Sequence, residues 1–163
     1  MQLSFIILVA LIVRLLATPW IPKEIVLDNP TYLHAANAIM QGHIIRNDAI
    51  MPLYPLFLAL FGGGEKAQYF IGMISSLTSI VLAWAFAQTL FEDKKTGLVA
   101  AGMMAVYPMS IFYSMLGLTE SLFVPLSLGA FIALHKNRIV TASILFVLSI
   151  LTRPVMDAFA PID

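Results

Sequence analysis

Long apolar runs, separated by short polar segments, dominate the sequence. A helix needs about 20 mainly apolar residues to cross the hydrocarbon core of a bilayer. Five runs approach this length and are predicted to be transmembrane helices: residues 3–20, 67–91, 97–113, 119–135 and 139–152. The pattern therefore predicts an all-α fold, a polytopic membrane helix bundle of about five transmembrane helices, in which residues 1–163 form a single transmembrane domain.

The segment between the first two runs, residues 21–66, is too polar at its ends to cross the membrane and too apolar in its middle to be a linker. Asn29 is placed to cap a helix that has Pro30 in its first turn, and Gly42 is a typical helix terminator. A second apolar helix is expected over residues 52–61, too short to span the bilayer. We interpret this segment as an outer loop with one or two interfacial helices.

Two prolines are expected to shape the helix ends. Pro108 lies near the end of the run 97–113 and predicts a kink, because proline cannot donate a backbone hydrogen bond. Pro154 follows the run 139–152, which is short for a span unless the helix continues through this proline.

Basic residues predict the orientation, because they concentrate in short cytoplasmic loops. Lys94 and Lys95 lie in one such loop, and Lys136 and Arg138 lie in another. The N-terminus is therefore expected in the cytoplasm, and the first run is interpreted as a retained signal anchor. This topology brings three polar residues from distant segments to the outer leaflet: Asp28, Glu120 and Arg153.

Composition and charge exclude several classes of protein. Hydrophobic residues make up 60% of the chain and charged residues 11%, whereas ordinary soluble domains have about 45–50% and about 25%. Nine basic and nine acidic residues cancel, so no basic surface suggests nucleic-acid binding. The chain has no cysteine, which excludes disulfides, thiolate metal sites and cysteine nucleophiles.

Each charge near an apolar run has a structural and a functional interpretation. Asp28 could cap the helix that follows, or act as a general base whose pKa is raised at a half-dry interface. Glu120 in the first turn of a helix complements the helix dipole. Arg153 offers a planar fork of donors for a phosphate, or it extends its charge to the interface. Arg14 is expected to do the latter or to pair internally, without a catalytic role.

A metal site has weak support. His34, His43, Asp28 and Asp48 share the outer loop, but their spacings match no ligand motif. We therefore predict no metal ligands and no certain cofactor, and a divalent metal stays open. A phosphate-binding glycine loop and a nucleophile elbow are absent from the sequence.

Short motifs follow one another along the chain: Arg14-Leu15, Asp28-Asn29-Pro30-Thr31-Tyr32, Pro52-Leu53-Tyr54-Pro55, Tyr107-Pro108, Tyr113-Ser114, Thr119-Glu120-Ser121-Leu122 and Thr152-Arg153-Pro154. In this order they resemble the N-terminal part of the GT-C glycosyltransferases, lipid-phosphosugar-dependent membrane enzymes such as the protein O-mannosyltransferases (glycosyltransferase family 39) and aminoarabinose transferases. The family often has Asp-Glu where this chain has Asp28-Asn29. Its members run to several hundred residues, so a fragment or a reduced relative is expected.

The resemblance implies transfer of a sugar from a polyprenyl-phosphate-linked donor to a lipid, glycan or protein acceptor outside the cytoplasm, in a bacterial or archaeal plasma membrane. The residues implied are Asp28 and Glu120 as catalytic groups and, for substrate binding, Arg153, Tyr32, Tyr54 and Tyr113. Two other functions stay open. A non-catalytic membrane subunit is favoured by the short length, whereas a small transporter is disfavoured by the scarcity of charge in the middle of the runs.

Overall fold

The computed structural model describes residues 2–20, 29–43 and 50–153, and this part of the chain is helical without strands. The elements are α1 (Gln2–Ala17) with a 3₁₀ turn η1 (Thr18–Trp20), α2 (Asn29–Met40), α3 (Leu53–Leu60), α4 (Glu65–Phe91), α5 (Lys94–Val106), α6 (Pro108–Leu116), α7 (Thr119–His135) and α8 (Ile139–Thr152). The predicted all-α fold class is confirmed.

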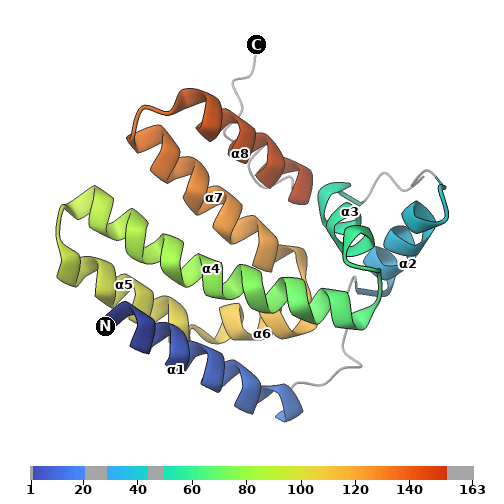
Figure 1. The fold of residues 1–163 in the computed structure, drawn as a ribbon, viewed down its shortest axis with the longest axis horizontal. Coiled ribbons are helices and arrows are strands. Elements are labelled where there is room, and N and C mark those ends of the chain that lie inside the picture. Colours follow the sequence, from blue (N-terminus) through green and yellow to red (C-terminus); the bar gives the residue numbers. More distant parts are fainter. Residues whose placement is uncertain (1, 21–28, 44–49, 154–163) are drawn as a thin grey trace.

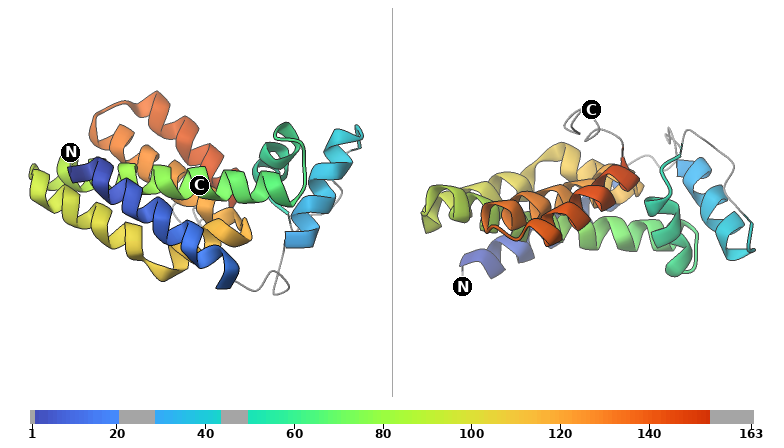
Figure 2. Two further views of the ribbon diagram at one scale, coloured as in Figure 1. Left: turned by 60° about the horizontal axis from the view of Figure 1, so that its bottom comes forward. Right: turned by 90° about the horizontal axis from the view of Figure 1, so that it is seen from above.

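The long helix α4 is the centre of the bundle. It packs against α1, α5, α6 and α7, and α7 forms an antiparallel hairpin with α8 (Figure 1). The short helices α2 and α3 pack on each other beside the start of α4, to one side of the other helices (Figure 2). Helices were predicted at both places within residues 21–66, and their position relative to a membrane stays a prediction.

Two or three helical segments of the described residues could cross a membrane. Within the described residues, α1 with η1 and α4 are long and apolar enough to span a membrane, and α5 with α6 makes a third span if the bent pair is counted as one. The two halves of that pair meet at 54°, which confirms the predicted kink at Pro108. Helices α7 and α8, with 17 and 14 residues, are apolar but shorter. The count of about five spans stays a prediction.

Close helix contacts are made at small residues. A Cβ atom at Gly72 in α4 would overlap the carbonyl oxygen of Ser114 in α6, and one at Gly97 in α5 would lie 2.9 Å from the carbonyl oxygen of Trp84 in α4. Glycine therefore allows these backbones to touch, as is common where membrane helices pack. The contact at Gly72 sets how closely α6 approaches α4, and the contact at Gly97 does the same for α5.

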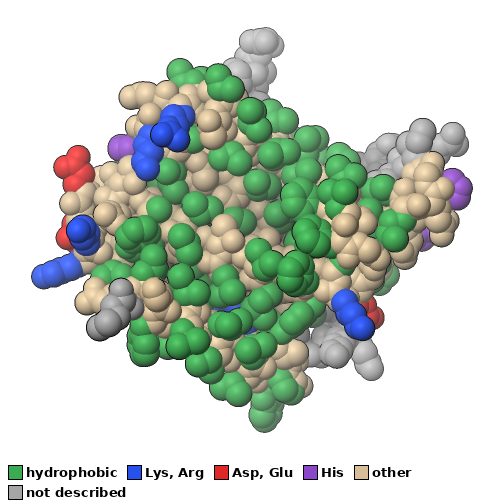
Figure 3. All heavy atoms as spheres, viewed as in Figure 1, with side chains coloured by type: hydrophobic (Ala, Val, Ile, Leu, Met, Phe, Trp, Pro, Cys, Tyr) green, Lys and Arg blue, Asp and Glu red, His purple; other side chains and the backbone are tan. Residues whose placement is uncertain are grey.

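The flanks of the helix bundle are apolar, and the charged side chains lie mainly at its ends. Hydrophobic side chains cover most of the face in Figure 3, and the Lys, Arg, Asp and Glu side chains gather toward its two ends. Large apolar side chains such as Phe5 and Val140 are exposed on the outer helices. An apolar surface of this extent suits contact with lipid, in agreement with an integral membrane protein.

One end of the bundle carries both short basic turns. The start of α1, the turn between α4 and α5, and the turn between α7 and α8 lie at this end, whereas α2, α3 and the start of α7 lie toward the other (Figure 1). Lys94 begins α5, and Lys136 and Arg138 lie in the α7–α8 turn. The two basic segments used to predict orientation thus share one end, as that prediction requires.

Candidate functional site: a cavity between helices

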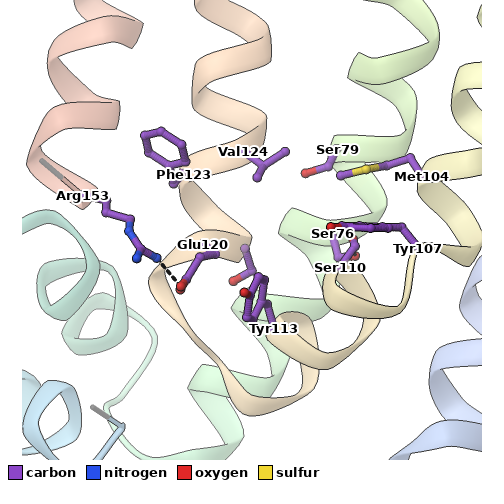
Figure 4. A pocket seen from close by; sticks show the side chains of 11 residues that line it. Ser76, Ser79, Met104, Tyr107, Ser110, Tyr113, Glu120, Phe123, Val124 and Arg153 are labelled. Atoms are coloured by element: carbon purple, nitrogen blue, oxygen red, sulfur yellow. Dashed lines mark hydrogen bonds and ion pairs between the residues drawn. The ribbon is translucent and has the colours of Figure 1, made fainter. Parts of the chain in front are cut away.

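A cavity of about 320 Å³ opens between α4, α6, α7 and the ends of α5 and α8. This volume is near the lower end of the range of small-molecule sites, which begins at about 300 Å³. Glu120 and Arg153 line one end, and Ser76, Ser110 and Tyr107 line the other (Figure 4). The apolar lining of the cavity includes Phe123, Val124 and Met104.

An ion pair between Glu120 and Arg153 forms the first end of the cavity (Figure 4). The α7–α8 hairpin explains it, because Glu120 lies in the first turn of α7 and Arg153 directly follows α8. The Glu120 side chain is 23% exposed and that of Arg153 is 40% exposed. The Thr119 hydroxyl also donates to the Glu120 carboxylate at 3.3 Å. Both charged groups thus remain reachable from the cavity.

Local backbone geometry positions Glu120. Gly117 ends α6 in the left-handed region with φ of 62°, which glycine adopts without strain. The chain then turns through Leu118 and starts α7 at Thr119. Glutamate in this first turn is stabilised by the positive end of the helix dipole. The position of Glu120 at the start of α7 therefore stabilises its negative charge, as the sequence predicted.

Tyr113 from α6 also lines the cavity. Its ring packs edge-on against Phe112, with ring centroids 6.1 Å apart. Three residues singled out from the sequence, Glu120, Arg153 and Tyr113, therefore line one cavity although they belong to different helices. Whether they act on a substrate stays a prediction.

Tyr54 and Tyr32 are placed differently, outside the cavity lining. Tyr54 is fully buried, and its hydroxyl donates to the carbonyl oxygen of Gly117. Burial raises the pKa of the Tyr54 hydroxyl, so the group stays protonated and can serve as this donor. The ring of Tyr32 meets that of Tyr54 edge-on, 5.4 Å between centroids. These contacts tie α2 and α3 to the turn before Glu120, and the substrate-binding role predicted for both tyrosines stays a prediction.

Asp28, the predicted general base, lies outside the described residues, as does Asp48. His34 and His43 are exposed. Among residues 2–20, 29–43 and 50–153, no group of three or more His, Asp or Glu side chains could hold a metal ion.

Arg14 is the residue whose importance the sequence did not reveal. It is fully buried in α1, and its guanidinium donates to the hydroxyls of Ser76 and Ser110 and to the carbonyl oxygens of Ala10 and Ala105. Internal pairing was one of the two arrangements predicted for the Arg14 side chain. The signal that could have completed the prediction is the row of serines in the otherwise apolar α4, because hydroxyls spaced along one face can solvate a buried cation.

Comparison with known proteins identifies the family. The family model described as dolichyl-phosphate-mannose-protein mannosyltransferase matches residues 51–158, more than half of the chain. The match covers α3 to α8 with Tyr54, Tyr113, Glu120 and Arg153, and it begins after α1 and α2. Searches of curated proteins and of solved structures found no match. The expected GT-C likeness is thereby confirmed, and the chain belongs to the dolichyl-phosphate-mannose-protein mannosyltransferase family of membrane glycosyltransferases.

Proposed function

We propose that the chain transfers a sugar from a polyprenyl-phosphate-linked donor to a lipid, glycan or protein acceptor on the non-cytoplasmic side of the membrane. The observation that carries this proposal is the cavity in which Glu120 and Arg153 meet between apolar helices. A donor with an isoprenoid tail has to be bound from within the bilayer. The combination of apolar walls with a few charged groups suits such a molecule.

Arg153 is proposed to bind the donor phosphate. Its guanidinium is planar and permanently charged, with donors that match phosphate oxygens. Glu120 pairs with Arg153 and neutralises this charge. A bound phosphate would replace the carboxylate on Arg153 and leave Glu120 to accept a hydrogen bond from a sugar or acceptor hydroxyl. Glu120 is thus proposed to orient the reacting groups, with Tyr113 as a further contact.

The proposed reaction is a displacement at the anomeric carbon. The acceptor hydroxyl oxygen forms a bond to this carbon, while the bond between the carbon and the phosphate oxygen breaks. The polyprenyl phosphate leaves with the bonding electrons, and the acceptor proton passes to a general base. Asp28 is proposed as that base, because a partly desolvated carboxylate is suited to take the proton.

The proposed orientation places the basic turns in the cytoplasm and Glu120 outside. It is supported by the position of Lys94 and Lys136 at the end of the bundle away from the start of α7. Tyr32 and Tyr54 remain proposed substrate-binding residues. Their contacts support the turn before Glu120, so they can also act by holding that turn in place.

The test is sugar transfer in membranes that contain the chain, with labelled polyprenyl-phosphate mannose as the donor. Asp28→Asn should abolish transfer with expression unchanged, and Arg153→Ala should raise KM for the donor by about tenfold or more, the cost of a lost hydrogen bond between charged groups. Asp93→Asn, at the other end of the bundle, is the control and should transfer normally.

Normal turnover by Asp28→Asn would remove Asp28 from the mechanism. A complete lack of transfer by the unaltered chain, in membranes where it is expressed, would instead favour the non-catalytic membrane subunit.

A further inference from the structure

The cavity has a second polar end that rests on a residue outside its lining. Ser76 from α4 and Ser110 from α6 line this end, and both accept hydrogen bonds from Arg14 in α1. The Arg14 Nε atom lies 2.9 Å from the Ser76 hydroxyl oxygen, and Nη2 lies 2.6 Å from the same oxygen and 3.3 Å from that of Ser110. The buried cation therefore reaches the cavity through two hydroxyl groups.

The remaining donors of Arg14 are used by the backbone. Nη1 donates to the carbonyl oxygens of Ala10 and Ala105, each at 3.1 Å. Ala105 is among the last four residues of α5, whose carbonyls have no partner within the helix. The five hydrogen bonds equal the number of N–H donors in a guanidinium. Arg14 is thus held in one position, with its charge close to the serines.

The chemistry of the groups fixes the direction of the hydrogen bonds. A guanidinium can only donate, so the Ser76 oxygen, with two bonds from Arg14, has both lone pairs occupied. Its own hydrogen can go to the Ser110 oxygen, 3.3 Å away. Ser110 then accepts from both Ser76 and Arg14. That leaves the hydroxyl hydrogen of Ser110, a residue of the cavity lining, available to a ligand in the cavity, and the bonds behind it polarise the group.

The other serines of the cavity lining lack this property. The hydroxyl of Ser79 donates to the carbonyl oxygen of Ser75 at 2.9 Å, and that of Ser121 donates to Leu118 at 2.7 Å. The hydroxyl hydrogens of these two serines are therefore already bonded to nearby backbone carbonyl oxygens. Ser110 is distinguished from them by its contact with a cation.

We propose that Ser110 donates a hydrogen bond to a phosphate oxygen of the bound lipid, with Arg14 as a positioning residue that supplies positive charge through Ser76 and Ser110. A negatively charged oxygen fits the serine end of the cavity because the positive charge of Arg14 lies behind the two hydroxyls and no carboxylate of the described residues pairs with it. At the other end the charges of Glu120 and Arg153 cancel. This inference rests on the proposed function. It offers the phosphate a place at the serine end of the cavity as an alternative to Arg153 at the opposite end (Figure 4), and the Arg153→Ala variant described above separates the two places.

The test is binding of polyprenyl phosphate, the product that keeps the phosphate, to the purified full chain in detergent. Ser110→Ala should raise Kd by about tenfold or more, as expected for a lost hydrogen bond to a charged group, and Ser110→Thr should restore it because threonine keeps the hydroxyl. Ser79→Ala is the matched control and should bind as the unaltered chain does. Arg14→Lys should weaken binding of polyprenyl phosphate more than binding of polyprenol, which has no phosphate.

Three outcomes would overturn this inference: equal Kd for Ser110→Ala and the unaltered chain, an equal loss for polyprenol, or no binding of polyprenyl phosphate by the unaltered chain. Competition by inorganic phosphate separates a site for the phosphate group alone from one that also needs the lipid. Tight, Ser110-dependent binding without sugar transfer would contradict the proposed function and leave the phosphate site intact. Sugar transfer that is insensitive to Ser110→Ala would contradict the phosphate site at Ser110 and leave the proposed function intact.

Discussion

The two arginines beside the cavity hold their charges in opposite ways. Arg14 is fully buried, and its hydrogen bonds go to hydroxyl and carbonyl oxygens of three neighbouring helices and of its own. Arg153 follows α8, is 40% exposed, and pairs with the carboxylate of Glu120. A cation surrounded by fixed dipoles cannot change partners without disturbing the helices, whereas an exposed pair can exchange one anion for another. Arg14 thus organises the fold and can act on a ligand only through the serines, whereas Arg153 can contact a ligand directly.

The largest effect expected from this comparison is on stability. Arg14→Met should destabilise the chain by about 3 kcal/mol or more, because it leaves the Ala105 carbonyl and two serines without their donor in a buried place. Arg153→Met should change stability by less than about 1 kcal/mol, as for other exposed ion pairs. Reversible unfolding in detergent micelles measures both. Equal losses of stability for Arg14→Met and Arg153→Met would contradict the distinction between the two arginines.

A smaller effect is expected at the contact that holds α6, and with it Ser110, against α4. Gly72→Ala should cost about 1–3 kcal/mol, because the added methyl group overlaps the Ser114 carbonyl and the backbones have to separate. Gly102→Ala is the matched control, since a Cβ there meets nothing within 4 Å. It should be neutral or slightly stabilising, as alanine favours helix over glycine.

Thermal unfolding of the two glycine variants, side by side, checks this prediction. The Gly72 variant should also weaken polyprenyl phosphate binding through Ser110. A stable Gly72→Ala protein with unchanged binding would mean that the α4–α6 contact does not position the serine end of the cavity.

The smallest effect is expected for an exposed charge far from the cavity. Asp93 caps α5, accepting hydrogen bonds from the Thr96 side chain and from the backbones of Thr96 and Lys95. These bonds, the Thr96 side chain first, lower the pKa of the Asp93 carboxyl below its ordinary value of 3.8. Since the pKa is lower in the folded than in the unfolded state, the stabilisation is complete above the ordinary value and is lost as pH falls through the folded one.

Asp93→Ala should therefore lower the unfolding temperature slightly at neutral pH, and the difference from the unaltered chain should shrink below about pH 4. Asp93→Asn keeps a cap and should differ less. Unfolding temperatures measured across this pH range test the sign. A difference that grows on acidification would contradict the assignment.

Much of the helical arrangement followed from the sequence. Apolar runs predicted the helices, Pro108 predicted the break between α5 and α6, and the alternation of spans predicted that Glu120 and Arg153 would share one end. These features depend on local chemistry and on the order of elements along the chain. They could be predicted because, in a hairpin of two helices, the end of the second helix lies beside the start of the first.

What could not be predicted is which side of each helix faces the cavity. Helix α4 is apolar around most of its circumference, so its pattern does not tell which face Ser76 takes. The two serine partners of Arg14 lie 62 and 96 residues away along the chain. A tyrosine in an apolar helix can bind a ligand or anchor a turn, and sequence alone does not separate Tyr54 from Tyr113. Asp28 lies outside the described residues, and its role stays a prediction.

Helix α6 acts as a spacer whose length sets the register between the two ends of the cavity. Ser110 lies in its first turn, and Gly117 ends it just before Glu120. Each residue advances an α-helix by about 100°, so one residue gained or lost within these nine would rotate the serine away from the acid while leaving both in the sequence. Substitution on the outer face of α6 is therefore far better tolerated than any change in the number of its residues.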